Sequence, residues 1–125
     1  PSVSWSEDVN WNDFIERDGL YYQKFTDVPF TGNVVGQRQG KIIEGKPEGE
    51  WVKYYFTGEL WENGNYKDGK KEGEWLWYYE NGQLKEKGNF KDGKKEGEWL
   101  SYHENGQLEK TEIYKDGELI KIIKH

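Results

Sequence analysis

Carboxylates are the most regularly spaced side chains in this chain that could do chemistry. Asp68, Asp92 and Asp116 recur at one interval, and Glu72 and Glu96 each follow an aspartate by four residues. Each cluster offers only one Asp and one Glu among lysines, far short of the six to eight oxygen ligands that Ca²⁺ prefers. The pattern predicts no metal site, and turn formation and solubility explain these residues better.

Histidine and cysteine chemistry is equally sparse. His103 and His125 are the two histidines, and the position of His103 holds a tyrosine, Tyr79, 24 residues earlier, which favours a half-exposed sheet residue over a general base. The sequence has no cysteine, so disulfides and thiol nucleophiles are excluded. It also shows no nucleophile elbow, phosphate-binding loop or metal-ligand spacing. We expect no enzymatic activity, no cofactor and no metal.

The aspartates belong to a repeat of 24 residues. Trp51, Trp75 and Trp99 share the interval, and the string GKKEGEWL occurs twice, followed each time by ENGQL. A fixed period of this length predicts a repeat architecture, in which each unit stacks on its neighbours. We expect three parts: an N-terminal lead and entry segment over 1–28, repeats over 29–118, and a C-terminal capping strand over 119–125.

One repeat reads as a β-hairpin. Residues 75–79 are strand-forming, 80–82 supply a turn with Asn and Gly, 83–90 resume an extended alternation, and 91–97 turn again with Asp and Gly. Short turns make successive strands antiparallel neighbours. The prediction is an all-β fold, an elongated antiparallel β-meander of tandem 24-residue hairpins with some seven to ten strands, and helix at most within 6–17.

Alternation along the strands predicts which residues share a face. If the Asn–Gly turn closes a three-residue loop, Tyr78 lies opposite Leu84 on one face. Period-2 counting places Gly64, Gly88 and three aromatics on that face as well, namely Tyr66, Phe90 and Tyr114. The opposite face then carries Trp51, Trp75 and Trp99, together with the positions that change between repeats.

The unit G-x-W-x-x-Y-x-x-x-G-x-L, followed by a G-N-aromatic-K-D-G-K-x-x-G turn, resembles the variant class of MORN repeats, found in bacterial proteins often labelled antitoxin components. The best matches in one unit are Gly73, Trp75, Tyr78, Asn81, Gly82, Leu84, Gly88, Phe90 and Gly93. The resemblance implies an elongated sheet of tandem hairpins, and association or scaffolding more than chemistry. The chain departs from the pattern at Thr57-Gly58, in place of Asn-Gly, and at Glu112, in place of Gly.

The overall composition limits which classes of molecule the protein could bind. A net charge of -6 and a pI near 5.0 argue against nucleic acid and anionic lipid headgroups. No apolar stretch approaches the roughly 20 residues of a membrane span, so we expect no direct membrane insertion. The first residue is Pro1, and a removed export signal or trimming would each account for it. The location stays unknown from the sequence, with a periplasmic or exported one slightly favoured over a cytoplasmic one, and the resemblance implies a bacterial protein.

Positions that vary between repeats are free of the repeat's own requirements and available for recognition. Aromatic residues fill four of them: Tyr55, Trp61, Trp77 and Tyr79. These rings could be core beneath the N-terminal residues Trp5, Trp11, Phe14 and Ile15, or they could be an interface. The sheet should also have open edges near Val34 and at 119–123, and Ile120 and Ile122 make the second edge the more apolar.

Three functions are open. The favoured one is a non-enzymatic module for protein–protein interaction, as a scaffold or an accessory subunit of a larger assembly. The alternatives are an antitoxin-like inhibitor that binds a toxin protein and a carbohydrate-binding module. The expected partner is another protein, and a homodimer is possible. Replacing Trp61 and Trp77 together by alanine should abolish co-purification of the partner and leave the fold intact.

Overall fold

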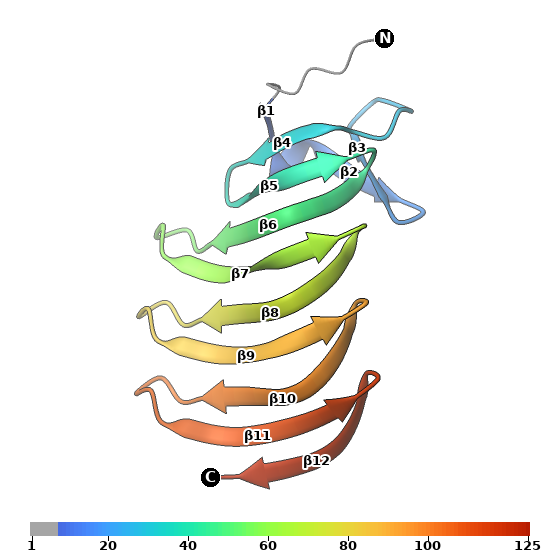
Figure 1. Ribbon diagram of the computed structural model, residues 1–125. Coiled ribbons are helices and arrows are strands. Elements are labelled where there is room, and N and C mark those ends of the chain that lie inside the picture. Colours follow the sequence, from blue (N-terminus) through green and yellow to red (C-terminus); the bar gives the residue numbers. More distant parts are fainter. Residues whose placement is uncertain (1–7) are drawn as a thin grey trace.

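The computed structural model describes residues 8–125, which form an elongated, curved β-sheet with a small second layer at its N-terminal end (Figure 1). The all-β meander predicted from the repeat is confirmed. In chain order the elements are β1 (Asp8–Asn10), a 3₁₀ turn η1 (Trp11–Asp13), β2 (Phe14–Arg17), β3 (Leu20–Gln23), β4 (Gly32–Val35), β5 (Arg38–Ile43), β6 (Lys46–Tyr54), β7 (Leu60–Lys67), β8 (Lys70–Tyr78), β9 (Leu84–Lys91), β10 (Lys94–Tyr102), β11 (Leu108–Lys115) and β12 (Glu118–Lys124).

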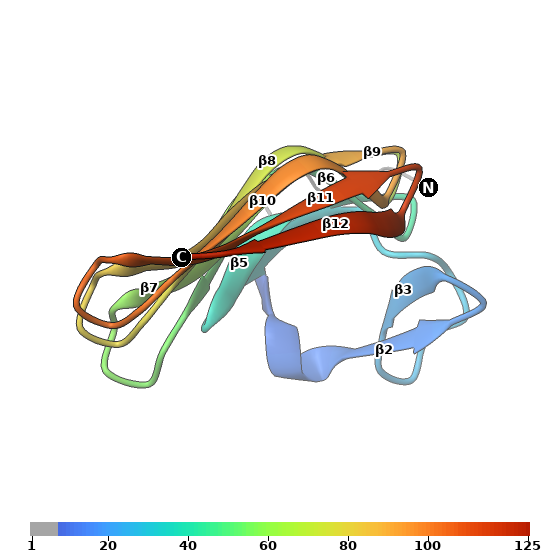
Figure 2. The ribbon, with the colours of Figure 1, turned by 90° about the horizontal axis from the view of Figure 1, so that it is seen from below.

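The main sheet has ten strands in the order β1-β4-β5-β6-β7-β8-β9-β10-β11-β12, and β2–β3 form a separate hairpin. Seen along the stack of strands, that hairpin lies beneath one face of the sheet (Figure 2). Strand β1 pairs in parallel with β4, with Val9 opposite Val34. The predicted open edge near Val34 is therefore wrong, because β1 satisfies the backbone groups that β4 would expose. The described strands number twelve, above the predicted seven to ten, because the entry segment adds three.

Two kinds of turn join the strands. Asp68 and Gly69 both have positive φ, 52° and 82°, as a two-residue type I′ turn requires, and this turn matches the twist of the strands it joins. At the other end of each hairpin the loop is longer, and Tyr79 N donates to the Gln83 carbonyl at 2.9 Å across three intervening residues. Tyr78 lies opposite Leu84. The predicted three-residue loop and its cross-strand pair are confirmed.

Replacing Gly82 or Gly106 by valine should lower the free energy of unfolding by about 1–2 kcal/mol. Their φ angles are 87° and 90°. At Gly82 no atom lies within 4 Å of an added Cβ, so the cost there comes from the backbone alone, whereas a Cβ at Gly106 would also meet the Gln83 side-chain oxygen at 3.3 Å. Urea denaturation measures it. Glu80→Val changes the same loop at a residue outside the positive-φ region and should cost less. Equal unfolding midpoints for all variants would contradict this turn geometry.

A β-bulge in each hairpin corrects the predicted faces. In the first hairpin, β6–β7, Tyr54 pairs with Leu60 and Lys53 pairs with Glu62, so Trp61 is an extra residue with no partner of its own. One extra residue reverses the alternation beyond it. Lys85 and Glu109 are the extra residues of the second hairpin, β8–β9, and the third, β10–β11. The glycines and aromatics of the returning strands therefore lie on the same face as the tryptophans, and the predicted separation was wrong.

Glycine and tryptophan alternate along one row of this tryptophan face, the sheet face that carries Trp51, Trp75 and Trp99. Gly64 lies directly opposite Trp51, and a Cβ added at Gly64 would meet the Trp75 ring closer than the 3.0 Å that real Cβ atoms respect. In the same way, a Cβ added at Gly40 would overlap the Trp51 ring, and one added at Gly88 would overlap the Trp99 ring. The three tryptophans are only 2%, 2% and 1% exposed. Glycine is thus required because the neighbouring indole occupies its side-chain space.

Each of these indoles also makes the same hydrogen bond. The Nε1–H of Trp75 donates to the backbone carbonyl of Asn65, the residue after Gly64, at 3.0 Å. The corresponding bonds of Trp51 to Lys41 and of Trp99 to Asn89 are both 3.2 Å.

The last repeat departs from this arrangement. Glu112 lies opposite Trp99, and Ile122 lies opposite Glu112. The departure from glycine at this position thus coincides with a smaller residue in the place of the indole.

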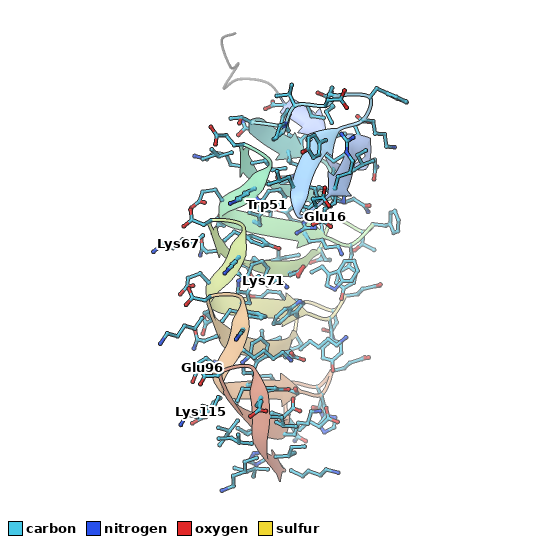
Figure 3. All side chains as sticks on the ribbon, turned by 90° about the vertical axis from the view of Figure 1, so that its right-hand side faces the viewer. Glu16, Trp51, Lys67, Lys71, Glu96 and Lys115 are labelled. Carbon is cyan, nitrogen blue, oxygen red and sulfur yellow. The ribbon has the colours of Figure 1, made fainter. Side chains whose placement is uncertain are left out.

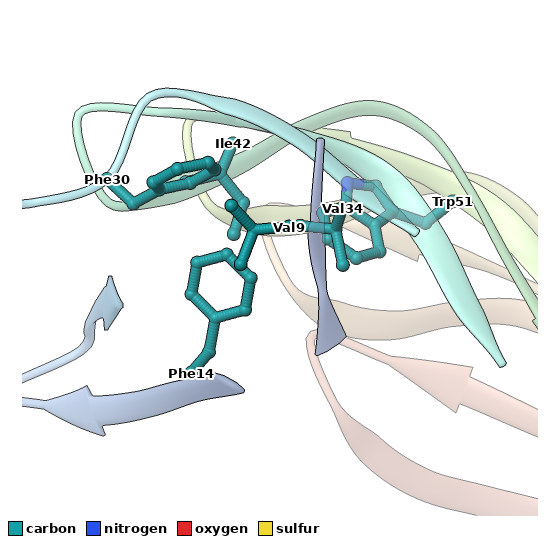
Figure 4. Packing of buried hydrophobic residues seen from close by; sticks show 6 residues of the cluster. All are labelled: Val9, Phe14, Phe30, Val34, Ile42 and Trp51. Atoms are coloured by element: carbon teal, nitrogen blue, oxygen red, sulfur yellow. The ribbon is translucent and has the colours of Figure 1, made fainter. Parts of the chain in front are cut away.

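The N-terminal segment covers the start of the tryptophan face. Its core cluster, seen in Figure 4, consists of Val9, Phe14, Phe30, Val34, Ile42 and Trp51, with Trp11, Tyr21 and Tyr66 packed against it. Two of the residues expected to fold back, Trp11 and Phe14, do so, whereas Ile15 remains 38% exposed and Trp5 lies outside the described residues. The cluster reaches the first tryptophan of the row.

The Asp–Gly turns stack upon one another along one side of the sheet, where Lys67, Glu96 and Lys115 also lie (Figure 3). The Asp92 backbone N–H donates to the Glu72 carboxylate at 3.1 Å, and Gly93 N donates to the Lys71 carbonyl at 3.0 Å. The repeating carboxylates therefore link turn to turn. Over residues 8–125 we find no group of three or more His, Asp or Glu side chains placed to hold a metal ion.

Candidate protein-binding surface

Trp61 and Tyr55 lie together on the first hairpin. Their rings are stacked, with centroids 4.8 Å apart and planes inclined by 10°. The ammonium nitrogen of Lys53 is 4.1 Å from the centroid of the Trp61 ring, within the range of a cation–π interaction. Trp61 can reach Tyr55 because it is the bulge residue, and a bulge re-aims a side chain away from the regular alternation.

A hollow of 330 Å³, here called the aromatic hollow, opens between η1 and this hairpin. Arg38 lines it, with the guanidinium carbon 4.4 Å from the Trp11 ring centroid, and donates a hydrogen bond of 3.0 Å to the Tyr66 hydroxyl. The residues that line the hollow are Trp11, Asn12, Gln37, Arg38, Lys53, Tyr54, Tyr55, Phe56, Thr57, Trp61 and Glu80. Five of these are aromatic, and two are cationic.

Phe56, in the loop of the first hairpin, is a surface residue that sequence reasoning missed. It is 97% exposed. The same position holds Glu80 in the second hairpin and Glu104 in the third. Comparing the three loops position by position would have found it, because an exposed phenylalanine that replaces glutamate has no role in making the turn.

Tyr55 and Tyr79 also connect neighbouring hairpins. The Tyr55 hydroxyl donates to the Tyr78 carbonyl at 2.6 Å, and the Tyr79 hydroxyl donates to the Tyr102 carbonyl at 2.7 Å. Loss of solvent raises the pKa of both phenols, and a nearby carboxylate, Glu80 for Tyr55, adds to the increase. Both tyrosines therefore have a structural role in addition to any contact with a partner.

Trp77 lies within the tryptophan face. Its ring centroid is 6.3 Å from that of Trp75 and 5.6 Å from that of Trp99, and its Nε1–H donates to the Glu62 carboxylate at 3.2 Å. Lys71 lies over the same cluster, with its ammonium nitrogen 4.7 Å from the Trp75 ring centroid. Burial lowers the pKa of Lys71, and Glu62 opposes that change. Trp77 thus fills the tryptophan face of the second hairpin.

Trp77→Ala should lower the free energy of unfolding by about 2 kcal/mol, because it removes a half-buried ring from between two buried tryptophans. Trp61→Ala, which removes a ring that packs mainly on Tyr55, should cost less than about 1 kcal/mol. Urea denaturation of the two single variants measures both. Equal costs would show that Trp61 is as much a part of the packing as Trp77.

Ile120 and Ile122 lie on β12, the edge strand at the far end of the sheet, which pairs only with β11 in the part of the chain that the structure describes. Their side chains are 59% and 49% exposed. The predicted site residues therefore fall in three places. The structure brings Tyr55 and Trp61 together, puts Trp77 and Tyr79 on the second hairpin, and keeps the two isoleucines five strands beyond β7.

Comparison with known families agrees with this architecture. A family model described as MORN repeat variant matches residues 47–68, 71–92 and 95–116. Each match spans one hairpin and ends at the aspartate of the following Asp–Gly turn, and together the matches cover just over half of the 125 residues. No curated protein matches the chain significantly, and no helix among residues 8–125 is long and apolar enough to cross a membrane. The repeat signature, the stacked hairpins and the matched model together place the chain in the family of MORN repeat variant proteins.

Proposed function

We propose that this protein is a non-enzymatic repeat module that binds another protein, as a scaffold or accessory subunit of a larger assembly, and that β12 is its main docking element. The observation that carries the proposal is the exposed, apolar edge of the sheet. On β12, Leu119, Ile120, Ile122 and Ile123 are 43%, 59%, 49% and 37% exposed. Edge strands present unpaired backbone groups that can accept a further strand.

The chemistry of this edge favours a protein partner. A strand from a partner protein would pair with the free backbone groups of β12 and cover its apolar side chains. Nucleic acids and sugars cannot form that backbone pairing. Lys121 and Lys124 hinder indiscriminate pairing, as charged residues on edge strands commonly do. Inhibition of a toxin would be one case of such binding. Carbohydrate binding has less support, because the rings of Tyr55 and Trp61 are stacked on each other and Trp77 packs among buried tryptophans.

Affinity purification from the native source tests the proposal. The full chain should retain a defined partner, and the Ile120→Lys/Ile122→Lys variant should lose it. Val28→Lys is the matched control, because it makes the same apolar-to-cationic change at a residue that is 73% exposed and distant in sequence from β12. Unfolding midpoints of the variants confirm that the fold is intact. Retention of the partner by the β12 variant, or no retained protein at all, would contradict the proposal.

A further inference from the structure

We infer that the aromatic hollow is a second docking site, which receives an acidic and aromatic peptide segment of the partner. The segment's carboxylate lies near Lys53 and Arg38, and its aromatic side chain lies against Phe56 and Trp61. This inference rests on the proposed protein-binding function. It adds a site at the opposite end of the sheet from β12 and a chemical class of ligand.

Comparison of the three hairpins is the first argument. Lys53, Phe56 and Trp61 occupy positions that hold different residues in the other repeats: Trp77, Glu80 and Lys85 in the second hairpin, and Ser101, Glu104 and Glu109 in the third. All three line the one hollow. Residues that the repeat does not require have therefore gathered at one place, next to Trp11 from outside the repeats.

Exposure of Phe56 is the second argument. The ring is 97% exposed, and it makes no ring contact with any aromatic residue of the described chain. The loop forms without it, because the corresponding loops have glutamate at this position and the same closing hydrogen bond, Tyr55 N to the Glu59 carbonyl at 2.9 Å here. Aromatic side chains, phenylalanine among them, are enriched at protein interfaces relative to the rest of the surface.

Charge is the third argument. The chain carries a net charge of -6, yet the hollow has two cations, Arg38 and Lys53, and one carboxylate, Glu80. Neither cation is within 4.0 Å of a carboxylate in the described structure, where the ion pairs are Arg17–Asp27 and Lys110–Glu112. Glu62, opposite Lys53 in the sheet, accepts the indole N–H of Trp77. An incoming carboxylate would find two cations that make no ion pair within 4.0 Å in the described structure.

The size of the hollow suits a peptide side chain. Its 330 Å³ is near the lower limit of ligand pockets, about 300 Å³, and accommodates one aromatic side chain with a neighbouring carboxylate. The rings in its walls already contact one another and the cations: Trp61 is stacked on Tyr55 and has Lys53 over it, and Trp11 has Arg38 over it. The ring of an aromatic residue next to Asp or Glu would therefore pack on the exposed ring of Phe56 and beside Trp61, and the carboxylate would lie near Lys53 and Arg38.

Selection from a displayed library of random dodecapeptides on the immobilised full chain tests the inference. Enriched peptides should place Asp or Glu within two residues of an aromatic residue. Synthesised with a fluorescent label, they should bind at least tenfold more weakly to Phe56→Glu and to Lys53→Glu by fluorescence polarisation. Phe56→Glu gives the first hairpin the residue of the other two, so its unfolding midpoint should match that of the parent.

A matched control moves the phenyl ring. The Phe56→Glu/Glu104→Phe variant carries the same exposed ring on the third hairpin, away from Trp11 and Arg38, and should remain as weak as Phe56→Glu. Restored binding would overturn the inference, because the ring would then be merely adhesive. Equal affinity of the parent and Phe56→Glu, enrichment of peptides without acidic residues, or no enrichment would overturn it too.

The two proposals fail in distinguishable ways. If the partner purified from the native source is lost from the β12 variant and kept by Phe56→Glu and Lys53→Glu, the module binds protein, and the aromatic hollow is not a docking site. If no partner is retained by the full chain, the protein-binding function itself is wrong.

Discussion

Replacing Gly88 by alanine should lower the free energy of unfolding by about 3 kcal/mol, at the upper end of the usual cost of overpacking. A Cβ at this position would overlap the ring of Trp99. The ring is 1% exposed and its Nε1–H donates to the Asn89 carbonyl at 3.2 Å, so it cannot move aside without losing both packing and a hydrogen bond. Urea denaturation monitored by tryptophan fluorescence measures the loss.

Gly73→Ala is the matched control for that variant. Gly73 lies on β8 with a φ of 74°, and a Cβ there would meet no atom within 4 Å. Its substitution therefore carries only the backbone cost of an alanine at positive φ, about 1 kcal/mol. If both variants lost the same stability, contact with the tryptophan would not be the reason for glycine in this row.

Trp75→Ala should be the most damaging substitution in the repeats, with an expected loss of about 4 kcal/mol. The ring is 2% exposed, and its centroid lies 5.1 Å from that of Tyr66 and 6.2 Å from that of Phe90. Its removal opens a cavity in the tryptophan face and leaves the Asn65 carbonyl without its indole donor. Thermal and urea denaturation should both show the loss, and a cost below about 1 kcal/mol would refute the central role of the ring.

The same ring allows a test by double-mutant cycle. Gly64→Ala alone should cost about 3 kcal/mol, because the new Cβ would overlap Trp75. In the Trp75→Ala background that overlap disappears, so the added cost of Gly64→Ala should fall below about 1 kcal/mol. Should the double variant not fold, Trp75→Leu provides a milder background. Additive costs would mean that the two positions do not interact.

The fold could be predicted from the sequence because its determinants are local. Asp68-Gly69 and Asn81-Gly82 specify turns through their own backbone preferences, and the 24-residue period repeats those turns along the chain. Two short turns per unit leave antiparallel neighbours as the arrangement of the strands. The pairing of Tyr78 with Leu84 followed from the loop length alone.

The faces of the sheet could not be predicted in this way. Counting by two assumes an unbroken strand, and the extra residue at Trp61 carries no local signature that distinguishes a bulge from a regular position. The pairing of β1 with β4 was missed for another reason. It joins Val9 to Val34 across 25 residues through strands of three and four residues, too short to show a pattern.

The candidate site was predicted in part. The rule that variable positions are available for recognition pointed to Tyr55 and Trp61, which the structure brings together. The rule did not foresee that Trp77 packs against Trp99, because that contact depends on the curvature and bulges of the sheet. Phe56 was overlooked because it lies in a loop and not in a strand.

The glycine–tryptophan row makes the length of this molecule adjustable in steps. Each unit fits its neighbour through an indole over a glycine, so a second copy of residues 69–92 inserted after Asp92 would supply both halves of the contact at each new junction. With strands about 4.8 Å apart, one inserted hairpin would extend the sheet by roughly 9.6 Å. The aromatic hollow and β12 would then lie farther apart by that distance. The number of repeats would thus set the separation of the two binding sites.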